Sequence, residues 1–226
     1  MPLPTLALVL LLAAEPPARE LFNGKDLAGW VVEGPREFKD GDKVAPVWVA
    51  KDGVLSCMVP RSSFGFLRYT GQEFADFHLS LEYRFAAPGT AGRRGNSGVG
   101  IRTVPFDPME SRKTRPSFAC YEVQLQDDAD RKPSKHTTGS LYRYVAPKEQ
   151  AARPAPEWNA IEIKCVGPRI EVTLNGKKIL DVDQTSVDPI KDKPLKGFIC
   201  LQNHGSRVDF RNIKVREINA PTNPKR

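Results

Sequence analysis

Residues 161–182 read IEIKCV-GP-RIEVTL-NG-KKILDV, which is three short strands joined by two tight turns. In the first two strands apolar and polar residues alternate, and a strand sends successive side chains to opposite faces of a sheet. The pair Asn175-Gly176 is a strong hairpin signal because both residues accept a positive φ angle. The segment therefore predicts consecutive antiparallel strands, each with one buried face.

Strand patterns of this kind dominate the rest of the chain. Residues 77–85 alternate over nine positions, and residues 208–218 form another alternating strand near the end. Many short strands at close spacing, without helical patterns between them, indicate an all-β fold, an antiparallel β-sandwich. At 226 residues the chain suits a single domain with a sizeable core.

The N-terminus carries an uncharged apolar run, residues 3–14, that ends in small residues. It is too short to cross a bilayer and has the length of the apolar part of a signal peptide. We therefore expect a signal peptide over residues 1–14 and export to the periplasm or out of the cell; a retained anchor or a misassigned start are the alternatives. After its removal no apolar run of membrane length is left, so no membrane span is expected. Residues 219–226 are expected to form a disordered tail.

Composition argues against several kinds of site. The net charge is +7, but the basic residues are dispersed or lie in loops, so no nucleic-acid binding is expected. The cysteines, Cys57, Cys120, Cys165 and Cys200, are far apart and have no histidine at ligand spacing, so no metal site is expected. The sequence is compatible both with buried free thiols and with disulfides at these four cysteines. No dinucleotide or phosphate-binding motif occurs, and we expect no cofactor.

Three further stretches alternate but have an unusual polar side. They are residues 96–102 (NSGVGIR), 121–127 (YEVQLQD) and 200–204 (CLQNH). The polar positions hold Arg, Glu, Gln, Asn and His, which bind hydroxyl groups and transfer protons. We expect the strands at 78–85, 96–102, 121–127 and 198–204 to share one sheet whose polar face binds a ligand. Two long polar connections, residues 103–118 and 128–138, are expected to form the rims of the site.

Three residues of these stretches are candidates for catalysis. Glu122 is the first, because its neighbours on a polar face can shift its pKa. His204 shares a face with Gln202 and is one of only three histidines. Arg102 ends a strand rich in glycine, where a ligand can approach a guanidinium that stabilises negative charge. A structural ion pair between Arg102 and Glu122 is the competing explanation.

Seven short motifs follow one another along nearly the whole chain: residues 21–30 (LFNGKDLAGW), 95–98 (GNSG), 121–124 (YEVQ), 158–159 (WN), 174–176 (LNG), 202–205 (QNHG) and 210–213 (FRNI). In this order they resemble the 3-keto-disaccharide hydrolase domain family, long catalogued as a domain of unknown function. Each motif is weak alone, and the ordered set is specific. The resemblance implies a concanavalin-like jelly roll over residues 19–218 and chemistry on glycosides oxidised at C3.

For such substrates the resemblance implies elimination followed by hydration. A ketone at C3 acidifies the proton at C2, a base removes it, the enolate expels the group at C1, and water adds back. The proton transfers fall to Glu122 and His204 in either order, and stabilisation of the enolate falls to Arg102. Hydroxyl binding falls to the amide side chains of Asn96, Gln124 and Gln202. A separate oxidoreductase must supply the 3-keto-glycoside, since this chain has no redox motif.

Two other functions remain open. An ordinary glycosidase would pair Glu122 with a second carboxylate, Glu82 or Asp127, both of which we also expect near the substrate. A carbohydrate-binding module without catalysis would show exposed aromatic rings along the polar face. This chain has Arg, Glu and His in those positions, which favours an enzyme.

Overall fold

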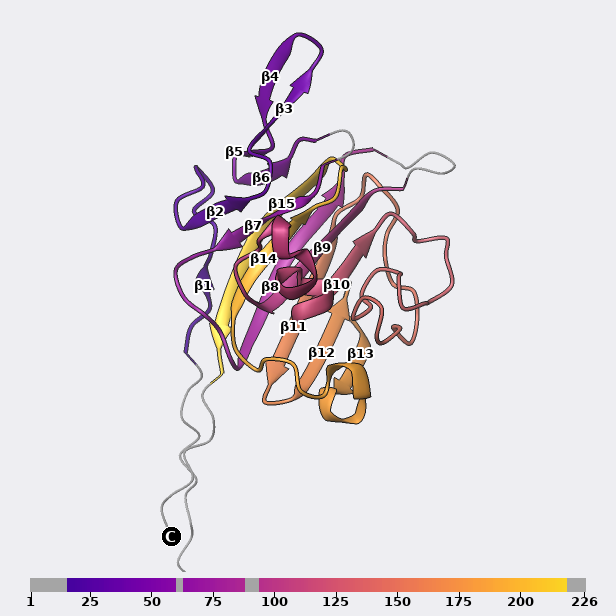
Figure 1. Cartoon of the computed structure of the whole chain (residues 1–226). Helices are drawn as coiled ribbons and strands as arrows, with labels where there is room; N and C mark the ends of the chain where they lie inside the picture. The colour runs from indigo at the N-terminus through magenta and orange to yellow at the C-terminus, as the bar shows by residue number, and fades with distance from the viewer. Residues whose placement is uncertain (1–15, 60–62, 88–93, 219–226) are drawn as a thin grey trace, which may run out of the picture.

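The computed structural model describes residues 16–59, 63–87 and 94–218. The expected signal peptide and tail, residues 1–14 and 219–226, lie outside the described residues. Two antiparallel sheets pack face to face, and the hairpin of β3 (Glu37–Asp40) and β4 (Lys43–Pro46) extends from one end (Figure 1). The expected all-β sandwich is confirmed.

The larger sheet has eight strands. In order across the sheet they are β13 (Lys177–Asp183), β12 (Arg169–Leu174), β11 (Asn159–Val166), β8 (Phe77–Phe85), β15 (Val208–Glu217), β6 (Val54–Cys57) and β5 (Trp48–Lys51), while β1 (Arg19–Glu20) also pairs with β15. The run β11–β12–β13 is the one predicted from residues 161–182. Asn175 at φ 50° and Gly176 at φ 81° form the turn between β12 and β13, as their sequence indicates.

The smaller sheet has five strands. In order they are β10 (Tyr121–Gln126), β9 (Asn96–Thr103), β14 (Phe198–Asn203), β7 (Gly65–Tyr69) and β2 (Trp30–Glu33). Three of the four strands expected together, at 96–102, 121–127 and 198–204, are therefore neighbours in one sheet. Glu122 lies opposite Gly100 and Gln124 opposite Gly98 across the β9–β10 pair.

The prediction that residues 78–85 join the same sheet is wrong. This strand, β8, pairs with β11 and β15 in the larger sheet. Its alternation buries Leu79 and Leu81 and leaves Glu82 on the other side. Alternation identifies the buried face of a strand, but both sheets bury the same kind of face. The pattern therefore cannot assign a strand to one sheet or the other.

A single hydrophobic core joins the two sheets. Its members on the larger sheet include Leu79, Leu81, Ile161 and Ile163, and on the smaller sheet Val99, Ile101, Val123 and Leu125. Burying one such side chain contributes about 1.5–3 kcal/mol. The core therefore fixes which face of β9 and β10 points inward, and the opposite face, with its polar side chains, must point outward.

Two further features concern the open questions from the sequence. All four cysteines are buried and free, so the structure contains thiols rather than disulfides at these positions. None of the helices in the described ranges has the length and apolar character needed to cross a membrane.

Candidate functional site

The segment after β9 covers part of the polar face of the smaller sheet. It contains η1 (Pro108–Glu110), α1 (Ser111–Thr114) and α2 (Pro116–Ala119), which lie in front of the sheet in Figure 1. A Cβ atom on Gly100 would lie 3.2 Å from Cγ of Pro116, so α2 rests directly on β9. The expected rim at 103–118 thus borders the polar face, but it contains short helices.

Glu122 lies under this cover. Only 3% of the residue is exposed, and its Oε2 atom has no hydrogen-bond partner in the described structure. Burial raises the pKa of Glu122 from the usual 4.5 to about 7. Arg115 opposes this most strongly, and the other groups that favour the charged form are Gln202, Ser117 and Arg143. A carboxyl group with a pKa of about 7 can give or take a proton near neutral pH.

Gln202 and Ser117 face Glu122 with unsatisfied polar atoms. Both lie close enough to the carboxyl group of Glu122 to favour its charged form. Neither of them, however, forms a hydrogen bond of full geometry with that group. The amide atoms of Gln202 and the hydroxyl of Ser117 are buried without a partner among the described residues. Such atoms are uncommon in native proteins and are often found at functional sites.

Gly98 leaves the space that Glu122 occupies. A Cβ atom on this residue would lie 3.0 Å from Cγ and 3.2 Å from Oε1 of Glu122. Gln124 sits opposite Gly98 on β10, so the glycine opens the face between these polar side chains. Gly98 of the GNSG motif therefore has no side chain at the position where the carboxyl group of Glu122 lies.

His204 stands at the exposed end of the same face. Its Nδ1 atom lies 3.4 Å from Nδ2 of Asn96, and Oδ1 of Asn96 accepts a 3.0 Å hydrogen bond from Gln124. Its ring meets Phe64 edge-on, with ring centres 5.4 Å apart. Partial removal of the ring from water, and then the charge of Arg115, lower the pKa of His204. The imidazole is therefore neutral at pH 7 and can accept a proton.

Arg115 influences both proton-transfer candidates, and the sequence did not single it out. Its guanidinium carbon lies 4.2 Å from the ring centre of Phe64 and 5.7 Å from that of Phe118. It lowers the pKa of both Glu122 and His204. It forms no ion pair within the described residues, and its Nε atom is buried without a hydrogen-bond partner. This cation is therefore available to a negative charge that forms on the polar face.

The expected position of Arg102 on the polar face is wrong. Its side chain is fully buried, donates a 2.8 Å hydrogen bond to the carbonyl of Ala75 and lies 3.6 Å from the carboxylate of Asp76. Arg102 has a φ of 53°, and the pairing of β9 with β14 is irregular between Phe198 and Cys200. The irregularity breaks the alternation at the end of β9, so the side chain turns inward.

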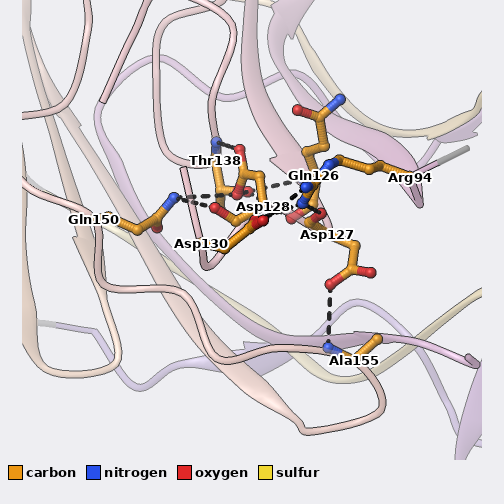
Figure 2. Close-up of polar contacts among 8 residues, drawn as sticks. All are labelled: Arg94, Gln126, Asp127, Asp128, Asp130, Thr138, Gln150 and Ala155. Atoms are coloured by element: carbon orange, nitrogen blue, oxygen red, sulfur yellow. Dashed lines mark hydrogen bonds and ion pairs between the residues drawn. The ribbon is translucent and has the colours of Figure 1, made fainter. Parts of the chain in front are cut away.

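The two carboxylates considered as partners of Glu122 also lie elsewhere. Glu82 accepts a hydrogen bond from Arg211 on the outer surface of the larger sheet. Packed sheets lie about 10 Å apart, so their outer surfaces cannot share one small substrate. Asp127 points to the backbone N–H of Ala155, from which it accepts a 3.2 Å hydrogen bond (Figure 2). The expectation that Glu82 contacts the substrate of this face is therefore wrong, whereas contact by Asp127 stays a prediction.

A cavity of about 380 Å³ continues the polar face beyond Asn96 and Gln124. Its other polar lining residues include Gln126, Arg131, Lys132 and His136. The expected rim at 128–138 thus lines the cavity. Two of the predicted hydroxyl-binding amides lie here, whereas Gln202 is buried next to Glu122. The volume is in the lower range of small-molecule sites.

No metal centre accompanies these residues. Within the ranges 16–59, 63–87 and 94–218, no group of three His, Cys, Asp or Glu side chains is placed to hold a metal ion. The chemistry that the site can offer from its own side chains is proton transfer by Glu122 and His204 next to the cation of Arg115.

Several known proteins resemble this chain. A family model described as a 3-keto-alpha-glucoside-1,2-lyase-like domain matches residues 17–216. A 3-keto-disaccharide hydrolase of Bacteroides thetaiotaomicron is 24% identical over 87% of this chain and 77% of its own length. A proposed glycosyl hydrolase of Parabacteroides distasonis has a TM-score of 0.67 at 24% identity, over 89% of this chain and 94% of its own. The carbohydrate-binding module CBM66 of Bacillus subtilis has a TM-score of 0.53 at 13% identity, over 84% of this chain and 96% of its own. At these identities the likeness to the solved structures shows the fold alone.

Proposed function

Because the chain belongs to the 3-keto-alpha-glucoside-1,2-lyase-like domain family, we propose that it is an enzyme that cleaves glycosides oxidised at C3. The observation that carries the proposal is Glu122, a buried carboxyl group with a pKa of about 7 on the same face as a neutral His204. One proton-exchanging carboxyl group, a neutral imidazole and a nearby cation suit removal of a proton next to a ketone.

The arrangement of carboxylates favours this chemistry over conventional glycoside hydrolysis. That reaction uses two carboxyl groups about 5–10 Å apart. A further carboxylate on the outward side of the smaller sheet, Glu33 of β2, is paired with Arg68 at 2.6 Å. β2 lies four strand positions from β10, roughly 19 Å at the usual spacing between strands. Glu33 is therefore engaged at the far side of the sheet, by Arg68 and by the backbone N–H of Phe106, rather than placed beside Glu122 as a second catalytic carboxylate.

In the proposed reaction, a base removes the proton from C2 and the electron pair of that bond forms an enolate whose negative charge lies on the C3 oxygen. The ketone then re-forms as the C1=C2 double bond is made and the bond from C1 to the leaving oxygen breaks. An acid protonates that oxygen, and water then adds hydroxyl to C1 and hydrogen to C2. Glu122 and His204 supply these two proton transfers. Arg115 takes the role first assigned to Arg102 and stabilises the negative charge on the C3 oxygen.

The cover over Glu122 must move for this reaction. Ser117 lies next to the carboxyl group and Pro116 packs on Gly100, the residue opposite Glu122, whereas His204 is already exposed. Tyr144 ties the cover down by a 3.1 Å hydrogen bond to the carbonyl of Ser117. Short covering segments of this kind commonly open and close over a substrate.

The purified protein should release the aglycone from a 3-keto-glucoside and leave the matching unoxidised glucoside intact. Without the ketone the C2 proton is far too weakly acidic to be removed. In D₂O, deuterium should also enter C2 of recovered 3-keto-glucoside if proton removal is reversible. Chromatography and mass spectrometry follow both outcomes. Cleavage of the plain glucoside would support a conventional glycosidase, and binding without cleavage of either would support a carbohydrate-binding module.

Gly98→Ala should lower turnover of the 3-keto-glucoside about tenfold or more. The added Cβ would press on Cγ of Glu122 at 3.0 Å, and small displacements of a catalytic group are costly. The φ angle of Gly98 is not positive, so alanine should not strain the backbone and the melting temperature should change little. In the double variant with Glu122→Gln, Gly98→Ala should cause no further loss. A further, independent loss would show that Gly98 acts through something other than Glu122.

Two parts of the proposal concern the setting of the enzyme. A separate oxidoreductase forms the ketone at C3, because the cleavage described here consumes a ketone without making one. Export of the protein, proposed from residues 1–14, would bring it together with glycosides outside the cytoplasm.

A further inference from the structure

Two cationic side chains line the cavity beside the proposed catalytic face. Arg131 and Lys132 follow β10, and both are exposed. Neither side chain forms an ion pair with any described residue. Elsewhere among the described residues, some exposed cations are paired, as Arg169 is with Asp181 at 2.7 Å, and others, such as Arg36 and Lys51, are not. What distinguishes Arg131 and Lys132 is that they lie next to each other on the lining of a cavity. The cavity thus holds two positive charges without a direct counter-ion.

The acidic residues of the same segment are engaged away from the cavity. Asp130 forms a double ion pair with Arg94, one of whose bonds measures 2.7 Å (Figure 2). Asp128 is buried and accepts hydrogen bonds from Thr138 and Gln150. Neither carboxylate lines the cavity. Asp128 and Asp130 therefore do not contact a ligand in the cavity, and they reduce its positive charge only at a distance.

Arg131 acts on both of these carboxylates from a distance. It lowers the pKa of Asp128 and of Asp130, although burial of Asp128 raises the pKa of that group overall. Lys132 is not among the main influences on the pKa of either residue. These two carboxylates therefore balance part of the charge of Arg131.

The rest of the lining offers hydrogen-bond donors and a path to the reacting groups. The amide of Gln126 points away from the acidic cluster in Figure 2. The rings of His136 and Tyr142 meet edge-on at 5.1 Å. Gln124 and Asn96 line the cavity and connect it to His204 through hydrogen bonds of 3.0 and 3.4 Å. A ligand that fills the cavity therefore extends towards the groups assigned to proton transfer.

We infer that this cavity binds an anionic group of the substrate, a carboxylate or a sulfate ester, at a position of the oxidised glycoside away from the reacting atoms C1, C2 and C3, such as C6. Two adjacent cations on the lining of a polar cavity supply an attraction that an anionic group can use and an uncharged sugar cannot. A guanidinium binds carboxylate or sulfate through two parallel hydrogen bonds, and an ammonium adds a point charge. The inference rests on the proposed function for the reacting sugar, but the preference for an anion stands on the lining alone.

Binding of unoxidised sugars tests the preference without any turnover. In NMR titrations at low salt, methyl β-D-glucuronide should bind about tenfold more tightly than methyl β-D-glucoside, the scale expected for two exposed charge contacts. Added salt should reduce the difference by screening. The 6-sulfate of methyl β-D-glucoside serves as a third probe and separates a carboxylate site from a sulfate site. Equal binding of charged and uncharged sugars, or no binding of any of them, would overturn the inference.

A matched pair of double variants locates the effect. Arg131→Gln with Lys132→Gln should remove the preference for the charged sugar. Arg36→Gln with Lys51→Gln removes the same net charge from exposed positions that do not line the cavity, and should keep the preference. A preference that survives in the first pair, or is lost in the second, would contradict a site at the cavity.

Turnover separates this inference from the proposed function. With the 3-keto derivatives of the same two glycosides, the ratio of kcat/KM for the charged over the uncharged substrate should fall about tenfold in the Arg131 and Lys132 variant. A wild type that binds the glucuronide more tightly but cleaves neither ketone would refute the proposed function and leave the inference standing. Cleavage of both ketones with equal kcat/KM would refute the inference alone.

Discussion

Glu122→Gln should lower turnover of a 3-keto-glycoside at least about 100-fold, the usual scale for the loss of general acid–base help. Glutamine keeps the size and a neutral polar end, but it cannot give or take a proton near pH 7 as the carboxyl group does at its pKa of about 7. Steady-state release of the aglycone at pH 7 measures the effect. Because the side chain lies on the outward face of the smaller sheet, outside the hydrophobic core, the variant should retain the fold.

Glu157→Gln is the matched control for this experiment. Glu157 is exposed in the loop before β11 and is not on the polar face, so its substitution should leave turnover unchanged. Near-normal turnover of Glu122→Gln, together with the normal activity of the control, would remove Glu122 from the mechanism. His204 would then have to carry both proton transfers.

The same substitution should change how stability depends on pH. The pKa of Glu122 is about 7 in the folded protein and near 4.5 when the chain is unfolded. Below pH 4.5 Glu122 is protonated in both the folded and the unfolded state, so its ionisation does not change the free energy of unfolding. Between pH 4.5 and 7 the unfolded chain releases the proton and the folded protein keeps it, so stability falls as pH rises. The total loss by pH 8 is on the order of 3 kcal/mol.

Urea unfolding at pH 4.5 and pH 8 tests this expectation. The Glu122→Gln variant has no proton to release, so relative to the wild type it should gain on the order of 3 kcal/mol of unfolding free energy between the two values. All other titrating groups are common to both proteins and cancel in the comparison. A constant difference between wild type and variant across this range would show that the burial of Glu122 does not perturb its ionisation.

A residue that lowers stability when it is charged and is needed for turnover is typical of active sites. Natural proteins tolerate such a cost where the function depends on it. The two measurements on Glu122 therefore support each other: lost turnover with restored stability at pH 8 is the pattern expected of a catalytic group. Lost turnover with lost stability would indicate a structural role.

Arg102 and Arg115 illustrate how far a strand pattern can be trusted. Alternation assigned Arg102 to the polar face, and it was correct for Glu122 and Gln124 on the regular strand β10. At Arg102 the strand is irregular and φ is positive, which the sequence NSGVGIR does not reveal. Arg115 lies outside any strand, in a basic run that reads as an ordinary loop. Its place between Phe64 and Phe118 depends on residues about 50 positions apart in the sequence.

The sequence by itself determined the elements and their buried faces. The alternation in β11 and β12 and the turn at Asn175 and Gly176 are local properties, because a strand's period of two and a glycine's freedom at positive φ act within a few residues. For the same reason the polar faces of β9, β10 and β14 could be predicted, and with them the candidates Glu122 and His204.

Only the tertiary structure decided which strands share a sheet and which side chains meet. Strand β8 has the same alternation as β10 but pairs in the other sheet, so Glu82 and Glu122 lie on opposite outer surfaces. The pKa of Glu122 is raised because the side chain is buried under α2. Arg115, which acts on this pKa in the opposite direction, belongs to the same covering segment, residues 103–118. Such effects depend on distances through space, and packing of distant segments sets those distances; no local pattern of residues encodes them.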